Sequence, residues 1–253
     1  MKIGMPILFE FNSLKENISL ASELGFDFVE LNLNFDYCRN ELENNKELLN
    51  SLKNSNLEFT LHFYDEADFA SYDEVTNAYL KLLKKYLKLF KKLNIKLLNV
   101  HLNVGPVVTI SGVKNYMYDK EYDSYIKRLI KNLRKVEKEC WKYKVELVLE
   151  NTKMADFIEK TYLDLYKEGF AFNFDIGHDY TNKEKLKDLF KNNDFNLREF
   201  HFHDSTKTKD HLCLGEGDMN LKCYKEMIVD EYVLLELKSS EDLRKSINIF
   251  KEL

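Results

Sequence analysis

Short apolar segments alternate with amphipathic segments from one end of the chain to the other. Each apolar segment is rich in Val, Ile, Leu or Phe, as expected for strands of a parallel sheet that is buried on both faces. The predicted strands span residues 2–7, 26–33, 58–63, 96–104, 145–150, 170–175, 197–203 and 232–237.

The segments between the predicted strands carry apolar residues at spacings of three and four, which is the pattern of helices that bury one face. The clearest apolar stripe runs from Tyr79 to Phe90, and lysines fill the opposite face. Gly25 and Gly169 each stand between a predicted helix and the next strand, where a left-handed C-cap is favoured. The predicted helices span residues 14–24, 40–54, 72–93, 121–143, 157–167, 183–191 and 243–250, with a weaker one at 221–227.

Strand and helix alternate eight times over 253 residues, which is the length of one β/α barrel. No composition shift or linker divides the chain. We therefore predict an α/β fold, a single-domain (β/α)8 TIM barrel that comprises residues 1–253. An open doubly wound sheet is the alternative.

The composition is that of a globular protein, with 44% hydrophobic and 32% charged residues. No apolar run is long enough to cross a bilayer, and the first residues lack the plan of a signal peptide. We therefore expect a cytoplasmic protein without a membrane partner. The four cysteines lack C-x-x-C spacing and are expected to be free thiols. A formal net charge of -5 opposes non-specific binding of nucleic acid, which draws on basic surface.

Side chains of the metal-binding type stand at the carboxyl ends of five predicted strands. These residues are His101, Glu150, Asp175, His201 and Glu236. The carboxyl ends of parallel strands meet at one face of a barrel, where the active sites of β/α barrels lie. Three carboxylates with one imidazole favour Mn²⁺, Mg²⁺ or Co²⁺ and leave Zn²⁺ possible. We therefore predict one divalent metal ion bound by Glu150, Asp175, His201 and Glu236.

Further histidines stand close to these positions. His62 and His101 end the third and fourth strands, so they are expected to line the same polar pocket. His178 follows Asp175 in the motif D-I-G-H and is expected to reach the metal or a substrate oxygen. His211 precedes a glycine-rich loop whose backbone N–H groups could face a bound oxyanion, although a tight turn explains this loop equally well.

Two more positions border this set. Alternation along the seventh strand places His201 and His203 on one face, and we predict that His203 lies further out, at the rim. Glu30 ends the second strand, where it either lines the pocket or forms a structural ion pair.

The order of these motifs resembles the xylose-isomerase-like TIM barrel superfamily along nearly the whole chain. The motifs are LGFDFVEL, the strand-end His62 and His101, VLEN with Glu150, FDIGH with Asp175 and His178, HFHD with His201 and Asp204, HLCLGEGDMN from His211 onward, and LLELK with Glu236. This superfamily includes sugar and sugar-phosphate isomerases and epimerases, and AP endonuclease family 2 of the endonuclease IV type. Barrels of this kind often form pairs, so a homodimer is an open expectation.

In the isomerase and epimerase branch, the resemblance implies that the four predicted ligands hold one divalent metal ion. The matching glutamates, Glu150 and Glu236, would move a proton through an enediolate of a sugar, sugar phosphate or keto-polyol. A dehydratase acting on a similar hydroxy-ketone is a close variant. The substrate-binding residues would be His62, His101, His178 and His211.

The alternative is an endonuclease IV-like, zinc-dependent AP endonuclease that cleaves abasic DNA. In that branch a larger set of residues holds up to three zinc ions, and an aspartate is expected two residues before His211. This chain has Lys209 there, with Asp210 adjacent, and an ammonium group would repel cations. The first strand also lacks the histidine and double glycine of the nucleases. Both departures favour the small-molecule branch. A third hypothesis, a catalytically idle barrel that binds a metabolite, is opposed by the intact carboxylate set.

Overall fold

The strands of the computed structural model, which describes residues 1–253 apart from the side chain of residue 92, close into a parallel barrel. Within the described residues, eight strands follow one another around this barrel, and every neighbouring pair is parallel. In barrel order they are β1 (Lys2–Pro6), β2 (Phe28–Asn32), β3 (Glu58–His62), β4 (Ile95–His101), β7 (Glu146–Glu150), β8 (Ala171–Asp175), β9 (Asn196–Phe202) and β10 (Tyr232–Leu235). The predicted barrel is therefore confirmed, and the open sheet is wrong.

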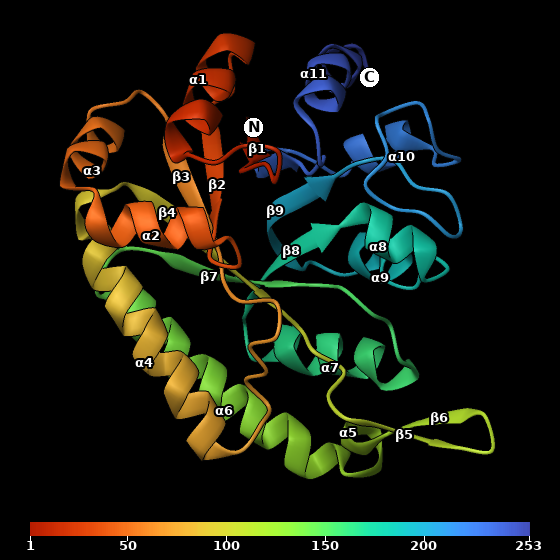
Figure 1. Ribbon diagram of the computed structural model, residues 1–253. Helices are drawn as coiled ribbons and strands as arrows, with labels where there is room; N and C mark the ends of the chain where they lie inside the picture. The colour runs from red at the N-terminus through yellow and green to blue at the C-terminus, as the bar shows by residue number, and fades with distance from the viewer.

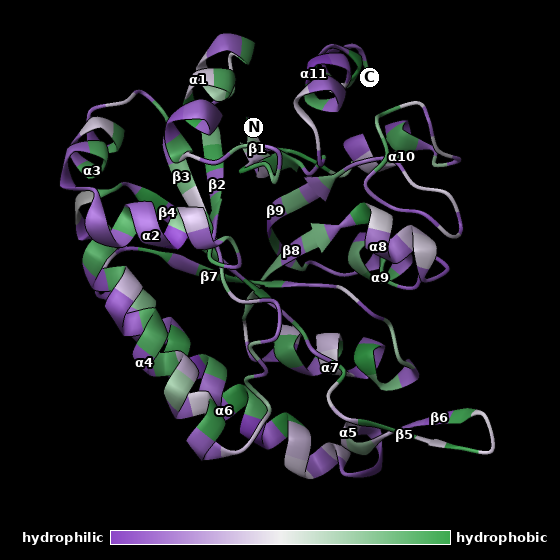
Figure 2. Ribbon diagram, in the orientation of Figure 1, coloured by the Kyte–Doolittle hydropathy of each residue, from purple (hydrophilic) through white to green (hydrophobic). Residues whose placement is uncertain are grey.

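Helices cover the outside of the barrel, as Figure 1 shows. They are α1 (Leu14–Leu24), α2 (Asp36–Asn44), α3 (Lys46–Lys53), α4 (Asp73–Leu89), the 3-10 turn η1 (Phe90–Lys92), α5 (Met117–Lys120), α6 (Tyr122–Trp141), α7 (Asp156–Lys167), α8 (Ile176–Thr181), α9 (Lys187–Asn192), α10 (Leu221–Lys225) and α11 (Ser240–Glu252). Figure 2 shows hydrophobic residues along the strands. On the outer helices, hydrophilic and hydrophobic residues are mixed. None of the described helices is both long and apolar enough to cross a membrane.

Two of the predicted helices differ from the observed ones. The predicted helix at 40–54 is two helices, because the Asn45 side chain accepts a hydrogen bond from the Leu48 N–H (3.0 Å) and begins α3 there. The predicted helix at 183–191 begins only at Lys187, because Lys183 and Glu184 have left-handed backbones (φ 70° and 53°). The short helix α8, which follows β8 directly, was not predicted.

The expected left-handed glycines are confirmed at Gly25 (φ 72°) and Gly169 (φ 78°). The segment after β4 forms two further strands outside the barrel. There β5 (Val107–Ile110) and β6 (Val113–Tyr116) pair as an antiparallel hairpin with exposed Val and Ile side chains. This hairpin projects away from the barrel (Figure 1).

The interior of the barrel near its amino-terminal end is closed by Phe28, which is fully buried on β2. Its ring lies where a side chain of Gly4, its register partner on β1, would stand. A Cβ added to Gly4 would lie 2.4 Å from the Phe28 ring, which is closer than real Cβ atoms approach. The glycine is therefore required by the size of its neighbour.

We predict that Gly4→Ala lowers the free energy of unfolding by about 1–3 kcal/mol, because the new methyl group overpacks the barrel interior. Chemical denaturation of the wild type, Gly4→Ala, Phe28→Leu and the double variant measures the free energy of unfolding of each protein in a double-mutant cycle. The smaller leucine side chain should recover part of the loss, so the two substitutions should couple favourably. Strictly additive effects would contradict the proposed contact.

Candidate metal centre and active site

Four predicted ligands come together at the carboxyl-terminal face of the barrel. Glu150 and Asp175 are the last residues of β7 and β8, His201 lies one residue before the end of β9, and Glu236 follows β10. One ligand atom from each of them lies within 4.8 Å of the others. The parallel register places them so, because β8 and β9 pair Asp175 directly with His201.

The Nδ1 atom of His201 faces all three carboxylates. It lies 3.1 Å from Glu236 Oε2, 3.5 Å from Glu150 Oε1 and 3.9 Å from Asp175 Oδ2. Glu236 is the most exposed of the four, with 21% of its side chain accessible. The 3.1 Å contact between His201 Nδ1 and Glu236 Oε2 is an ion-pair contact without hydrogen-bond geometry, and neither atom has another hydrogen-bond partner among the described side chains. These orphaned buried atoms, in a set of three carboxylates and one imidazole, fit a divalent cation.

The backbone around Asp175 is held by local polar contacts. Asp175 Oδ1 accepts a hydrogen bond from the His178 N–H (2.6 Å) and so begins α8, which carries His178 toward the same face. The Asn151 side chain bonds both the N–H and the C=O of Asp175 (2.9 and 2.8 Å). The motifs VLEN and DIGH thus support each other across β7 and β8.

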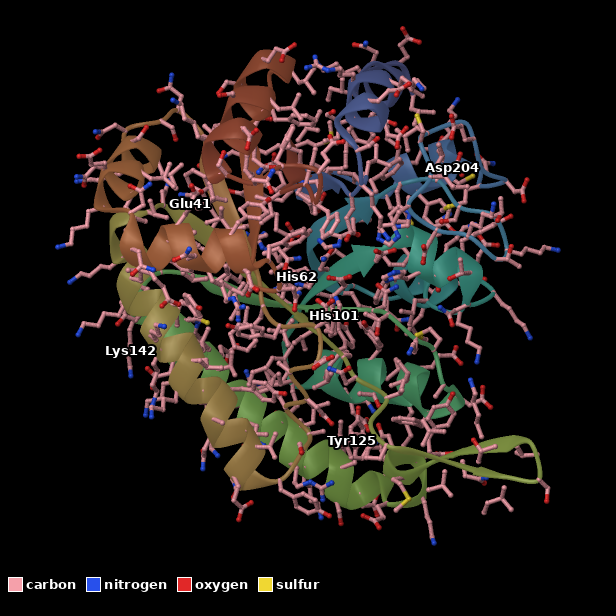
Figure 3. All side chains as sticks on the ribbon, in the orientation of Figure 1. Glu41, His62, His101, Tyr125, Lys142 and Asp204 are labelled. Atoms are coloured by element: carbon pink, nitrogen blue, oxygen red, sulfur yellow. The ribbon has the colours of Figure 1, made fainter. Side chains whose placement is uncertain are left out.

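A second group of potential ligands adjoins the first through Glu150. His62 and His101 point their Nε2 atoms at each other at 3.1 Å. The same two atoms lie 3.6 and 3.5 Å from the oxygens of Glu150. Figure 3 shows both histidines near the middle of the ring of strands. The expectation that they face the carboxylate pocket therefore agrees with the geometry.

A third group lies beside the first on the other side of the pocket. His178 Nε2 lies 3.7 Å from Asp210 Oδ2, and His211 Nδ1 lies 3.0 Å from Asp210 Oδ1. Lys209, in contrast, is exposed. The inference that an ammonium group stands at this position is therefore wrong, because the carboxylate one residue later takes the place. All six histidines of the chain belong to these groups or contact them.

His203 was predicted at the rim, and this is wrong: its side chain is fully buried. Its Nδ1 accepts a hydrogen bond from the His211 N–H (2.8 Å), so the ring proton is on Nε2, which lies 3.2 Å from Asp175 Oδ1. A Cβ on Gly177 would lie 2.0 Å from the His203 ring, which explains the glycine in DIGH. His203 therefore orients the carboxylate of Asp175 and secures the His211 loop.

The glycine-rich loop after His211 does not offer its N–H groups to a ligand. The Asp204 carboxylate accepts hydrogen bonds from the backbone N–H groups of Ser205 (2.8 Å), Gly215 (2.9 Å), Gly217 (3.0 Å) and Met219 (3.3 Å). Asp204 lies beside the loop that leads to α10 (Figure 3). Because these donors are satisfied internally, of the two explanations considered for this loop the oxyanion site is wrong and the tight turn holds.

Beneath the four ligands, the barrel interior holds two further acidic residues. Glu30 is buried, and its Oε2 lies 3.7 Å from the Nε2 atom of His201. Of the two roles considered, lining the pocket or forming a structural ion pair, it therefore has the second. Glu199 was not anticipated, although a charged residue two positions before His201 in an apolar strand is a usable signal. Burial, and then the charge of Glu30, raise the pKa of Glu199 well above its usual range.

The surrounding carboxylates raise the pKa values of the pocket histidines. Burial opposes protonation of His62, but the nearby carboxylates of Glu150 and Glu30 raise its pKa to about 10. Burial also opposes protonation of His211, but the nearby carboxylate of Glu236 contributes to raising its pKa to about 10. The pocket therefore attracts positive charge.

The carboxylates are affected in the opposite direction. Burial works against ionisation of Glu150, but the charges of His201 and His101 hold its pKa well below its usual range. Burial likewise works against ionisation of Glu236, but the charges of His211 and His201 hold its pKa well below its usual range. Both glutamates are thus carboxylates near neutral pH, as ligands or general bases must be.

A cavity of about 340 Å³ opens above the four ligands. One wall is apolar and includes Leu8, Phe9, Phe35 and Leu237, whereas the pocket histidines and the two glutamates supply the polar side. The adjoining mouth is acidic, and its lining includes Asp65, Glu66, Asp68 and Asp210. This volume is that of a small-molecule site, with polar groups gathered at one end.

Comparison with known proteins agrees with the barrel architecture. Among curated protein sequences, no relative matches the chain. A D-tagatose 3-epimerase-like protein superimposes with a TM-score of 0.79 at 22% identity, over 100% of this chain and 96% of that one. The IolI protein with a bound zinc atom superimposes with a TM-score of 0.77 at 15% identity, over 100% of this chain and 96% of that one. The 3-keto-D-glucoside 4-epimerase YcjR from E. coli superimposes with a TM-score of 0.77 at 17% identity, over 100% of both chains.

These structures share the fold of this chain. The family described as xylose isomerase-like TIM barrel matches residues 18–253, which is nearly the whole sequence and includes every residue of the three ligand groups. The chain therefore belongs to the xylose isomerase-like TIM barrel family.

Proposed function

We propose that the protein is a divalent-metal-dependent isomerase or epimerase of a sugar or keto-polyol. The observation that carries the proposal is the convergence of Glu150, Asp175, His201 and Glu236 within 4.8 Å. Two of them, Glu150 and Glu236, line a small-molecule cavity. The names of two similar structures, a D-tagatose 3-epimerase-like protein and a 3-keto-D-glucoside 4-epimerase, point to the same class of reaction.

The four ligands would hold one cation, with Mn²⁺, Mg²⁺ or Co²⁺ favoured and Zn²⁺ possible. When bound, the cation would polarise the substrate carbonyl and stabilise negative charge on its oxygen. His203 and Asn151 would keep Asp175 oriented. The four pocket histidines, His62, His101, His178 and His211, would donate hydrogen bonds to substrate oxygens.

Glu150 and Glu236 are suited to move a proton between two faces of one substrate. They stand on β7 and just after β10, strands that β8 and β9 separate around the barrel. One carboxylate would take the proton from the carbon next to the carbonyl, giving an enediolate, and the other would return a proton to the opposite face. Return to the same carbon inverts it, whereas return to the neighbouring carbon isomerises the sugar.

The substrate we propose is unphosphorylated. The N–H groups of the glycine-rich loop are bonded to Asp204, so they cannot cradle a phosphate. The acidic mouth would also repel a phosphorylated sugar. Neutral hydroxyl groups facing the histidines, with an apolar face of the sugar against Phe9 and Phe35, suit this cavity better.

We predict that Glu150→Gln and Glu236→Gln each lower turnover by about 10²–10⁴-fold, because an amide cannot accept the substrate proton. Exchange of substrate carbon-bound hydrogen for solvent deuterium measures the proton transfer directly. Glu47→Gln makes the same chemical change at an exposed position of α3 that lines neither the cavity nor its mouth, and it should leave exchange unaltered. A cooperative unfolding transition that matches that of the wild type would show that each variant keeps its fold. Full exchange in either active-site variant would refute the assignment.

We predict that cation binding at pH 7 releases protons. In the absence of a cation, burial opposes protonation of His201, but the charges of Glu150 and Glu236 raise its pKa well above its usual value. A metal ligand must be a neutral imidazole, so binding displaces this proton. The apparent affinity should therefore rise with pH, by about tenfold per unit for each proton released. Calorimetry in two buffers of different ionisation enthalpy counts the protons, and a buffer-independent enthalpy would contradict the prediction.

An AP endonuclease is the second candidate, and one observation favours it. The three adjoining groups, centred on Glu150, on Asp175 and on Asp210, could together hold three ions. Against it stand the acidic mouth and the net charge of -5, which disfavour a phosphodiester backbone.

We predict one tightly bound ion per chain by elemental analysis, and no incision of a synthetic abasic duplex. A catalytically inactive protein with both glutamates substituted serves as the control for contaminating nuclease. Three zinc ions per chain together with incision would replace the isomerase proposal by the nuclease.

A further inference from the structure

The two nitrogens of the His201 ring face different surroundings. Nδ1 points at the carboxylates of the proposed metal centre, the nearest being Glu236 Oε2 at 3.1 Å. Nε2 points down into the barrel, where Glu30 Oε2 lies at 3.7 Å and the Asn99 side-chain nitrogen at 3.5 Å. A neutral imidazole that binds a cation through Nδ1 carries its proton on Nε2, and that proton needs an acceptor.

Asn99 does not supply the acceptor. Its amide nitrogen donates to the Glu150 carboxylate and is the atom that faces His201. Glu30 Oε2 and Asn99 Oδ1 are both buried without a hydrogen-bond partner among the described residues. The Asn99 atom that faces Nε2 is a donor nitrogen, so Glu30 Oε2, at the ion-pair distance of 3.7 Å, is the acceptor that faces this nitrogen. Glu199 also lies within 4.8 Å of the His201 ring. Among the described side chains, however, it is Glu30 and not Glu199 that forms an ion pair with His201 Nε2.

We infer that Glu30 is a positioning residue: its carboxylate accepts the Nε2 proton of His201 and thereby holds Nδ1 toward the cation. The inference rests on the proposed metal centre. Such a carboxylate–histidine–metal arrangement fixes the tautomer and the ring orientation, and its removal typically costs metal affinity. The glutamate of LGFDFVEL, which touches neither substrate nor cation, thus has a defined task beneath the pocket.

The test uses the full chain loaded with Co²⁺, with affinity measured by competition against a chelator. Glu30→Leu, which keeps bulk but removes the acceptor, should weaken Co²⁺ binding by about 10–100-fold. Glu30→Gln, which retains an acceptor oxygen, should lose less. Thr60→Val is the matched control, because Thr60 is the buried register partner of Glu30 on β3 and its hydroxyl also lacks a partner among the described residues. This variant should bind Co²⁺ within about twofold of the wild type.

A second readout reports the tautomer itself. In wild-type protein loaded with Zn²⁺ and labelled with ¹⁵N-histidine, the His201 signal should show a proton on Nε2 and a metal-bound Nδ1. In Glu30→Leu the Co²⁺ absorption spectrum should change, whereas a purely structural role would lower stability and leave the spectrum of the loaded protein intact. The NMR measurement on wild type needs no variant to fold.

The outcomes separate the two levels of the argument. If the wild type binds no cation, the proposed function and this inference both fail. If the wild type binds a cation but Glu30→Leu binds it within about twofold, or the proton of His201 is on Nδ1, only the positioning role fails.

Discussion

The mutual repulsion of three converging carboxylates, two of them buried and one partly buried, is the constraint on which the rest of this site depends. Glu150, Asp175 and Glu236 meet at one face of the barrel because their strands are parallel and in register. Ionised carboxyl groups this close are stable only beside positive charge, since burial removes most of the water that would otherwise screen them. Histidines supply part of this positive charge when their rings are doubly protonated. A divalent cation meets it better, because one ion can contact all three groups at once.

Successive layers of side chains hold this cluster in place. Asn99 and Asn173 reach the Glu150 carboxylate from neighbouring strands, and His203 reaches Asp175 from the end of β9. Below them, Glu30 faces the inner nitrogen of His201. The ligands are therefore not side chains that happen to end strands. Glu150, Asp175 and His201 each face a partner whose own position the barrel determines, which is how a site reaches the accuracy that proton transfer requires.

Much of this arrangement could be predicted from the sequence, because strand ends are regular. The alternation of apolar and amphipathic segments predicted the barrel, and the residues at the strand ends predicted which four side chains would converge. Positions in loops could not be predicted in the same way. Whether Lys209 or Asp210 faces the pocket depends on the path of a turn, and spacing alone pointed to the wrong residue. His203 follows the strand alternation, but its burial depends on the loop that folds over it.

The internal carboxylate of Asp204 has a consequence for the energetics of binding. The glycine-rich loop is tethered to Asp204 by three hydrogen bonds, so it is already ordered before any substrate arrives. This loop follows His211, which lines the cavity, so little conformational entropy should be lost at that histidine when a ligand enters. The apolar wall differs, because the Phe9 ring is 86% exposed there and a substrate that packs against it would have to order it.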